Sequence, residues 1–113
     1  MDLSTDICRI SVVTSDDGVT IQVRGEIDLA TAPLLEAAFA GVHGAAVEVD
    51  ISEVTFCDAA GLRVLERAHG RLGPRLRITG APPLVRRLAG LLDMTWLSSD
   101  APACGRRYGD VQS

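Results

Sequence analysis

The amino-acid sequence predicts an α/β domain in which a mixed sheet of four to five strands carries amphipathic helices packed on it. Segments with apolar residues at every second position alternate with segments of helical spacing, in the order β-β-α-β-α-β-α and a last short β. A turn sequence, Asp16-Asp17-Gly18, separates the first two strand segments and indicates an antiparallel hairpin. The length of 113 residues is that of one domain.

The first half of the chain predicts two strands, a helix and a third strand. Apolar and polar residues alternate at residues 8–12 and 19–24, and again at 47–51, as in strands with one buried face. Residues 31–33, Thr-Ala-Pro, are typical of a helix start, and we expect the Thr31 hydroxyl to cap that helix. Its apolar face consists of Leu34, Leu35, Ala38, Phe39 and Val42.

The second half repeats this alternation. We expect a loop at residues 52–58, a second helix that closes at residues 73–74, and a short strand at 76–78. The pair Pro82-Pro83 opens a third helix, and residues 94–97 predict a last short strand. The apolar faces of the two helices are Leu62, Leu65, Ala68 or His69 and Leu72, and then Leu84, Val85, Leu88, Leu91 and Leu92.

Composition excludes several classes of partner. The net charge is −4 and all eleven basic residues are Arg, which gives no general attraction to nucleic acid or to an anionic membrane. The Arg side chains at positions 63–77 and 86–87 are expected to solvate outer helix and strand faces. No apolar run reaches the roughly 20 residues of a membrane span, and no secretory signal is visible. We therefore expect a cytoplasmic protein.

No residue pattern indicates catalysis, a cofactor or a metal. The three cysteines form no CxxC pair, and we expect free thiols, with Cys8 in the core and Cys104 exposed. There is no P-loop and no GxGxxG, and nothing arranges a nucleophile beside a base. We therefore predict a protein that works by binding another protein and is not an enzyme.

Two junctions between a strand and a helix differ from the rest of the scaffold, at residues 24–35 and 49–69. In each, a strand ends in acidic or small residues and a helix begins within a few positions. If the two strands are parallel, both junctions lie at the same edge of the sheet. We expect Asp58 to cap the second helix. Residues 59–61, Ala-Ala-Gly, then leave the first turn almost bare, so that another surface could approach its backbone.

These junctions resemble the STAS domain family, and more narrowly the bacterial anti-sigma factor antagonists. Residues 25–28 read GEID and residues 50–61 read DISEVTFCDAAG. The family patterns are roughly G-E-[LI]-D and D-[LI]-S-x-V-x-F-x-D-S-[SA]-G. The resemblance runs from about residue 8 to about residue 97 and implies the STAS fold. Residues 1–98 would form that domain, and residues 99–113 a short C-terminal tail of which we expect part to be disordered.

The resemblance implies regulation of transcription by partner switching. Such antagonists bind an anti-sigma factor, usually a small serine kinase with a histidine-kinase-like ATP fold, and thereby release a sigma factor. The chain would act as a monomer or a homodimer. Carried over by position, the partner-binding surface consists of Glu26, Asp28, Thr31, Asp58, Ala59, Ala60, Gly61 and Arg63.

The chain departs from the family where regulation is expected. The residue after the motif Asp is usually a Ser or Thr that the partner kinase phosphorylates, but here it is Ala59, followed by Ala60. We therefore predict an antagonist that lacks this phosphorylation switch. Redox control at Cys57 is a further hypothesis, since a nearby helix start lowers a thiol pKa whereas burial raises it. The alternatives are a STAS subunit that binds the ATPase of a membrane lipid-transport system, an enzyme, or a scaffold of such domains.

Overall fold

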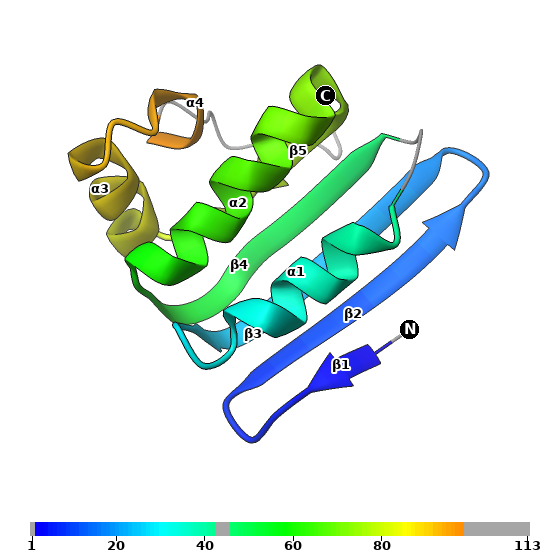
Figure 1. Ribbon diagram of the computed structural model, residues 1–113, viewed down its shortest axis with the longest axis horizontal. Helices are drawn as coiled ribbons and strands as arrows, with labels where there is room; N and C mark the ends of the chain where they lie inside the picture. Colours follow the sequence, from blue (N-terminus) through cyan, green and yellow to red (C-terminus); the bar gives the residue numbers. More distant parts are fainter. Residues whose placement is uncertain (1, 43–45, 99–113) are drawn as a thin grey trace.

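The computed structural model describes residues 2–42 and 46–98 (Figure 1). The predictions for the tail at residues 99–113, including Cys104, lie outside the described residues. The described elements, in chain order, are β1 Asp2–Ser4, β2 Cys8–Ser15, β3 Gly18–Ile27, α1 Ala32–Ala40, β4 Val47–Cys57, α2 Ala59–Leu72, a 3-10 turn Gly73–Arg75, β5 Leu76–Thr79, α3 Pro83–Leu91 and α4 Thr95–Ser98.

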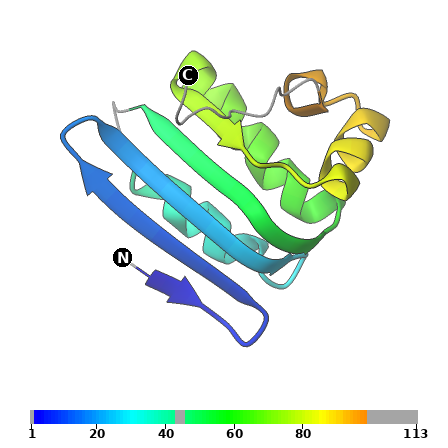
Figure 2. The same ribbon diagram turned by 180° about the vertical axis from the view of Figure 1, so that it is seen from behind.

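Within these ranges the strands form one mixed five-stranded sheet in the order β1-β2-β3-β4-β5. The pairs β1/β2 and β2/β3 are antiparallel, whereas β3/β4 and β4/β5 are parallel. Helices α1 and α2 cover the same face of the sheet (Figure 1), and the view from behind shows β2, β3 and β4 without a helix across them (Figure 2). The predicted fold class and the predicted hairpin are therefore confirmed.

The core lies on one side of the sheet because the strands alternate. Ile10, Ile21 and Val49 point to the helices and are fully buried. Their neighbours Arg9 and Gln22 belong to the opposite, more polar face. This pattern is typical of a sheet that packs helices on one face and meets water on the other. Cys8 is buried in this core, as predicted.

The predicted loop at residues 52–58 is wrong, because β4 continues to Cys57. The strand stays paired with β3 through two register irregularities, between Gln22 and Arg24 and between Gly25 and Glu26. Such irregularities disturb the two-residue alternation of buried side chains. The alternation of buried and exposed residues that predicted the strand therefore stops before the strand itself ends.

Two other expectations need correction, and one strand was missed. The predicted strand at residues 94–97 is wrong, since Thr95–Ser98 is the short helix α4. Strand β1 was not predicted, because three residues are too few to show a period. The predicted apolar face of α3 is only partly in the core, because Leu84 and Leu91 are 51% and 76% exposed.

Candidate functional site

The structure places the two junctions side by side, because the two strands before them are parallel, which was the condition for this expectation. Strands β3 and β4 are neighbours and run in the same direction. Helices α1 and α2 consequently begin at the same end of the sheet (Figure 1). A backbone hydrogen bond joins the junctions directly, since the Asp58 N–H donates to the Ile27 carbonyl at 3.1 Å.

The second junction is a capped helix start. The Asp58 side chain accepts a hydrogen bond from the Gly61 N–H at 3.0 Å, which confirms the predicted N-cap. Gly61 itself is buried. A Cβ at this position would lie 2.8 Å from the Ile27 carbonyl oxygen and 3.1 Å from the Cys57 sulfur. The first turn of α2 therefore rests directly on the end of β3.

A buried hydroxyl group stabilises the turn of the first junction by hydrogen bonds. The Thr31 side chain is not a helix cap, so that expectation is wrong. Its hydroxyl donates to the Glu26 carbonyl at 3.0 Å and accepts from the Asp28 N–H at 2.9 Å. The Asp28 carboxylate in turn accepts from the Thr31 N–H at 3.0 Å. Thr31 is only 2% exposed, because its hydroxyl is used to fold the turn.

A shallow groove of about 320 Å³ lies between the starts of α1 and α2. Leu29, 77% exposed, forms part of its wall. An ion pair between Glu36 and Arg67 joins the two helices along it. The groove is lined by Leu29, Ala32, Pro33 and Glu36 from the first junction and by Ala59, Ala60, Arg63 and Arg67 from the second.

The structure divides the eight predicted partner-binding residues into three groups. Ala59 and Arg63 are exposed and line the groove together with the half-buried Ala60. The three acidic residues are half-buried and do not line it: Glu26, Asp28 and Asp58. Thr31 and Gly61 are buried, so a partner cannot reach their side-chain positions without rearrangement.

Sequence reasoning missed five residues of the groove: Leu29, Ala32, Pro33, Glu36 and Arg67. Leu29 did carry a signal, because it is an apolar residue that fits neither the strand before it nor the helix after it. The participation of Glu36 and Arg67 depends on how α1 packs beside α2, and no local pattern encodes this.

Cys57 lies beneath this surface as a buried thiol. Burial, and then the neighbouring Asp58 charge, raise the pKa of Cys57 to about 12. The sulfur is also within 3.6 Å of the Asp58 carbonyl. A thiol must lose its proton to react, so these observations weaken the hypothesis of redox control at Cys57.

We expect Cys57 to resist alkylation in the folded protein. The Cys104→Ser variant retains Cys8 and Cys57, and burial raises the pKa of both thiols. At pH 8 the raised pKa of Cys57 keeps this thiol protonated in the native state, whereas a thiol in the unfolded chain titrates near a pKa of about 8.5. Iodoacetamide labelling followed by intact-mass analysis should therefore be slow in buffer and fast in guanidinium chloride. Fast labelling of native Cys57 would revive the redox hypothesis.

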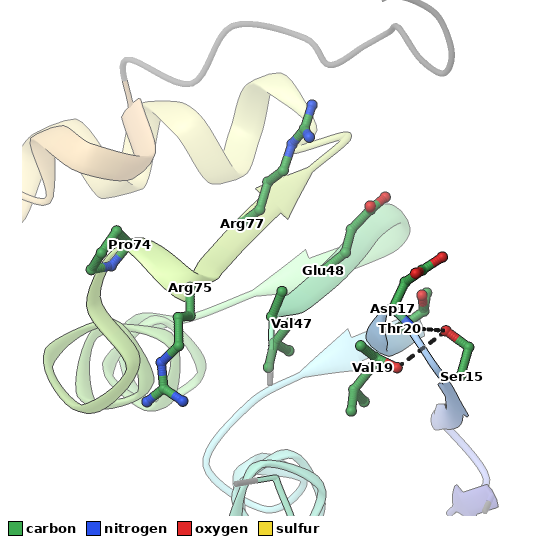
Figure 3. A pocket seen from close by; sticks show the side chains of 11 residues that line it. Ser15, Asp17, Val19, Thr20, Val47, Glu48, Pro74, Arg75 and Arg77 are labelled. Atoms are coloured by element: carbon green, nitrogen blue, oxygen red, sulfur yellow. Dashed lines mark hydrogen bonds between the residues drawn. The ribbon is translucent and has the colours of Figure 1, made fainter. Parts of the chain in front are cut away.

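A second hollow, of about 310 Å³, lies at the opposite end of the sheet (Figure 3). Arg75, Arg77 and Glu48 line it, together with residues of the β2–β3 hairpin. Figure 3 shows the two guanidinium groups pointing to opposite sides, so they do not converge on one ligand. This hollow therefore offers less for recognition than the groove between α1 and α2.

The described ranges contain no cluster of His, Cys, Asp or Glu that could hold a metal ion. None of the helices in the same ranges combines the length and the apolar character that a membrane crossing requires.

The fold and the motifs together define a STAS-type α/β domain. A family model described as "Mlab, STAS domain" matches residues 10–97. The chain therefore belongs to the STAS domain family, and the resemblance seen in its motifs is confirmed. No curated protein sequence matches it.

Solved structures agree with this assignment. An anti-sigma factor antagonist from Mycobacterium paratuberculosis is 28% identical, covers 82% of this chain and 84% of its own, and superposes with a TM-score of 0.70. An antisigma-factor antagonist STAS domain from Rhodobacter sphaeroides is 25% identical, covers 68% and 90%, and has a TM-score of 0.55. The unphosphorylated anti-sigma factor antagonist SpoIIAA, 15% identical over 78% and 84%, shares the fold with a TM-score of 0.58.

Proposed function

We propose that this protein is an anti-sigma factor antagonist that binds an anti-sigma factor with a kinase-like ATP fold and so releases a sigma factor. Two structures that are similar to the chain, at 28% and 25% identity, are anti-sigma factor antagonists. The groove between α1 and α2 supports recognition of a protein surface, because it combines an exposed Leu29 with the exposed cation of Arg63. An apolar anchor beside a charge is a common arrangement at such interfaces.

The observation that carries the proposal is the exposed methyl group of Ala59 at the first position of α2, on the wall of the groove. A hydroxyl there would be open to a kinase, and its phosphate would add about −1.5 to −2 charge beside Asp58. Ala59 cannot accept a phosphate. The groove would therefore stay competent to bind, and control would come from the amount of protein, from the partner or from another site.

The test is a binding assay against the kinase-like proteins of the same cell, with and without ATP. We expect the native chain to bind one of them, to gain no phosphate by intact-mass analysis, and to keep its affinity in ATP. Ala59→Ser should accept one phosphate if the partner kinase is active. A stoichiometric phosphate on the native chain that abolishes binding would contradict the proposal.

The same binding assay can test whether the negative charge of Asp28 at the first junction contributes to affinity. We expect Asp28→Ala to weaken binding about tenfold. Asp28→Asn retains the oxygen that accepts from the Thr31 N–H but removes the charge, so weak binding by both variants would assign the effect to charge. Asp16→Ala, in the hairpin between β2 and β3, is the control and should bind normally.

A second candidate is a STAS subunit that binds the ATPase of a membrane lipid-transport system. It is retained because the family model that matches the chain is described by the name Mlab and not as an anti-sigma factor antagonist. The same helix start and groove would serve either partner. Recovery of a transporter ATPase with the tagged chain would favour this candidate, and recovery of a small kinase-like protein would favour the first.

A further inference from the structure

Helix α3 carries an apolar stripe that the core covers only in part. Val85 and Ala89 are buried and Leu92 is half-buried, so these three residues face the core. Leu84, Leu88 and Leu91 each precede one of them by a single position. They therefore form a second row, about 100° around the helix from the first. Leu84 and Leu91 are 51% and 76% exposed, and Leu88 between them is half-buried with one side against the core.

A cation borders this stripe. Arg87 follows Leu84 by three positions and precedes Leu91 by four, which places it on the same side of α3. It is exposed. Among the described residues, ion pairs join Arg24 to Glu53 and Arg67 to Glu36, and neither involves Arg87. Arg86 follows Val85 and lies on the other border of the buried row.

We propose that this side of α3 docks an acidic amphipathic helix of a partner protein. The three leucines offer anchor positions at helical spacing, as in helix-to-helix recognition. Arg87 would pair with a carboxylate beside the partner's apolar row. The surface is separate from the groove of the proposed function, because α2 stands between α1 and α3 (Figures 1 and 2). The inference does not rest on that function.

A second copy of the chain fits this surface poorly. Arg87 is at the middle of α3, Pro83–Leu91, so an antiparallel two-fold pairing of the helix would bring two Arg87 side chains together.

The chain's own C-terminal residues also lack the right chemistry. Residues 99–113 contain no Leu, Ile, Phe or Met, and they include Pro102, Gly105 and Gly109. Their two acidic residues, Asp100 and Asp110, are balanced by Arg106 and Arg107, so the segment has no net negative charge to attract Arg87. The surface requires an apolar row and negative charge, and this segment lacks both. A partner helix with apolar residues three and four positions apart and with flanking Glu or Asp has both.

The test uses two synthetic peptides of about 15 residues, long enough for helix formation. Both have Leu at three-four spacing, and one has Glu where the other has Lys. With the ¹⁵N-labelled full chain, we expect the acidic peptide to bind about tenfold more tightly and to shift the amide resonances of α3. Arg87→Glu should reverse the preference, and Leu84→Gln with Leu91→Gln should abolish binding.

The controls are Arg86→Glu, on the other border of the helix, and Val13→Gln, an exposed apolar residue of β2. Both variants should bind the acidic peptide as the native chain does. The proposal is overturned if the two peptides bind equally, if the acidic peptide does not bind, or if the shifts fall in the groove between α1 and α2. Dimerisation of the free chain through α3 would also overturn it.

Discussion

Gly61→Ala is expected to lower the free energy of unfolding by about 2–3 kcal/mol, although Ala is the better helix former. The new Cβ would lie 2.7 Å from Ile27 Cγ2 and 2.8 Å from the Ile27 carbonyl oxygen. The methyl group could turn away, but the carbonyl belongs to the backbone of β3. The gain in helix propensity is at most about 1 kcal/mol. The cost of overpacking therefore exceeds the gain in helix propensity, and the free energy of unfolding falls.

Gly70→Ala in the same helix is the matched control. A Cβ there meets nothing within 4 Å, so this variant should gain about 0.5–1 kcal/mol. Guanidinium chloride unfolding of the two variants measures both effects on one scale. If Gly61→Ala were as stable as Gly70→Ala, the close packing of α2 on β3 would be disproved.

Gly61 also has a consequence for binding. The methyl groups of Ala59 and Ala60 reach the groove wall because the first turn of α2 rests on the end of β3. Moving that turn outward would change the shape of the groove without altering any exposed side chain. We therefore assign Gly61 a positioning role.

Local patterns predicted much of the fold and part of the site. The hairpin and the Asp58 cap follow from short-range features: alternation, a turn sequence, and an acidic residue before a bare helical turn. Such features act within a few residues. They therefore remain visible in the sequence without knowledge of the tertiary structure.

Other features were hidden because tertiary packing decides them. Residues 94–97 are too few to show a period, and it is the burial of both Met94 and Leu97, three positions apart, that fits the short helix α4 and not a strand with one buried face. The motif resemblance marked Thr31 and Gly61 together with Ala59, although the first two are buried and the third is exposed. A motif does not separate residues that touch a partner from residues that hold the touching ones in place.

Thr31→Val tests this distinction at the first junction, and we expect it to cost about 2–3 kcal/mol of unfolding free energy. Valine has nearly the same shape as threonine but cannot replace the hydroxyl. The Asp28 N–H and the Glu26 carbonyl would each lose a partner, at 2.9 and 3.0 Å respectively. Leaving a buried polar group without a hydrogen bond costs about 1–3 kcal/mol. The turn that presents Asp28 and Leu29 would then loosen.

Thr55→Val is the matched control, because Thr55 is exposed on β4 and such surface changes usually stay within about 0.5 kcal/mol. Unfolding curves give the stability of both variants, and the partner assay gives their affinity. Since Thr31 is 2% exposed, we expect a loss of affinity in Thr31→Val to act through the conformation of the turn and to accompany the loss of stability. Normal stability together with lost binding would instead mean that the partner reaches this hydroxyl directly, and the positioning role would be wrong.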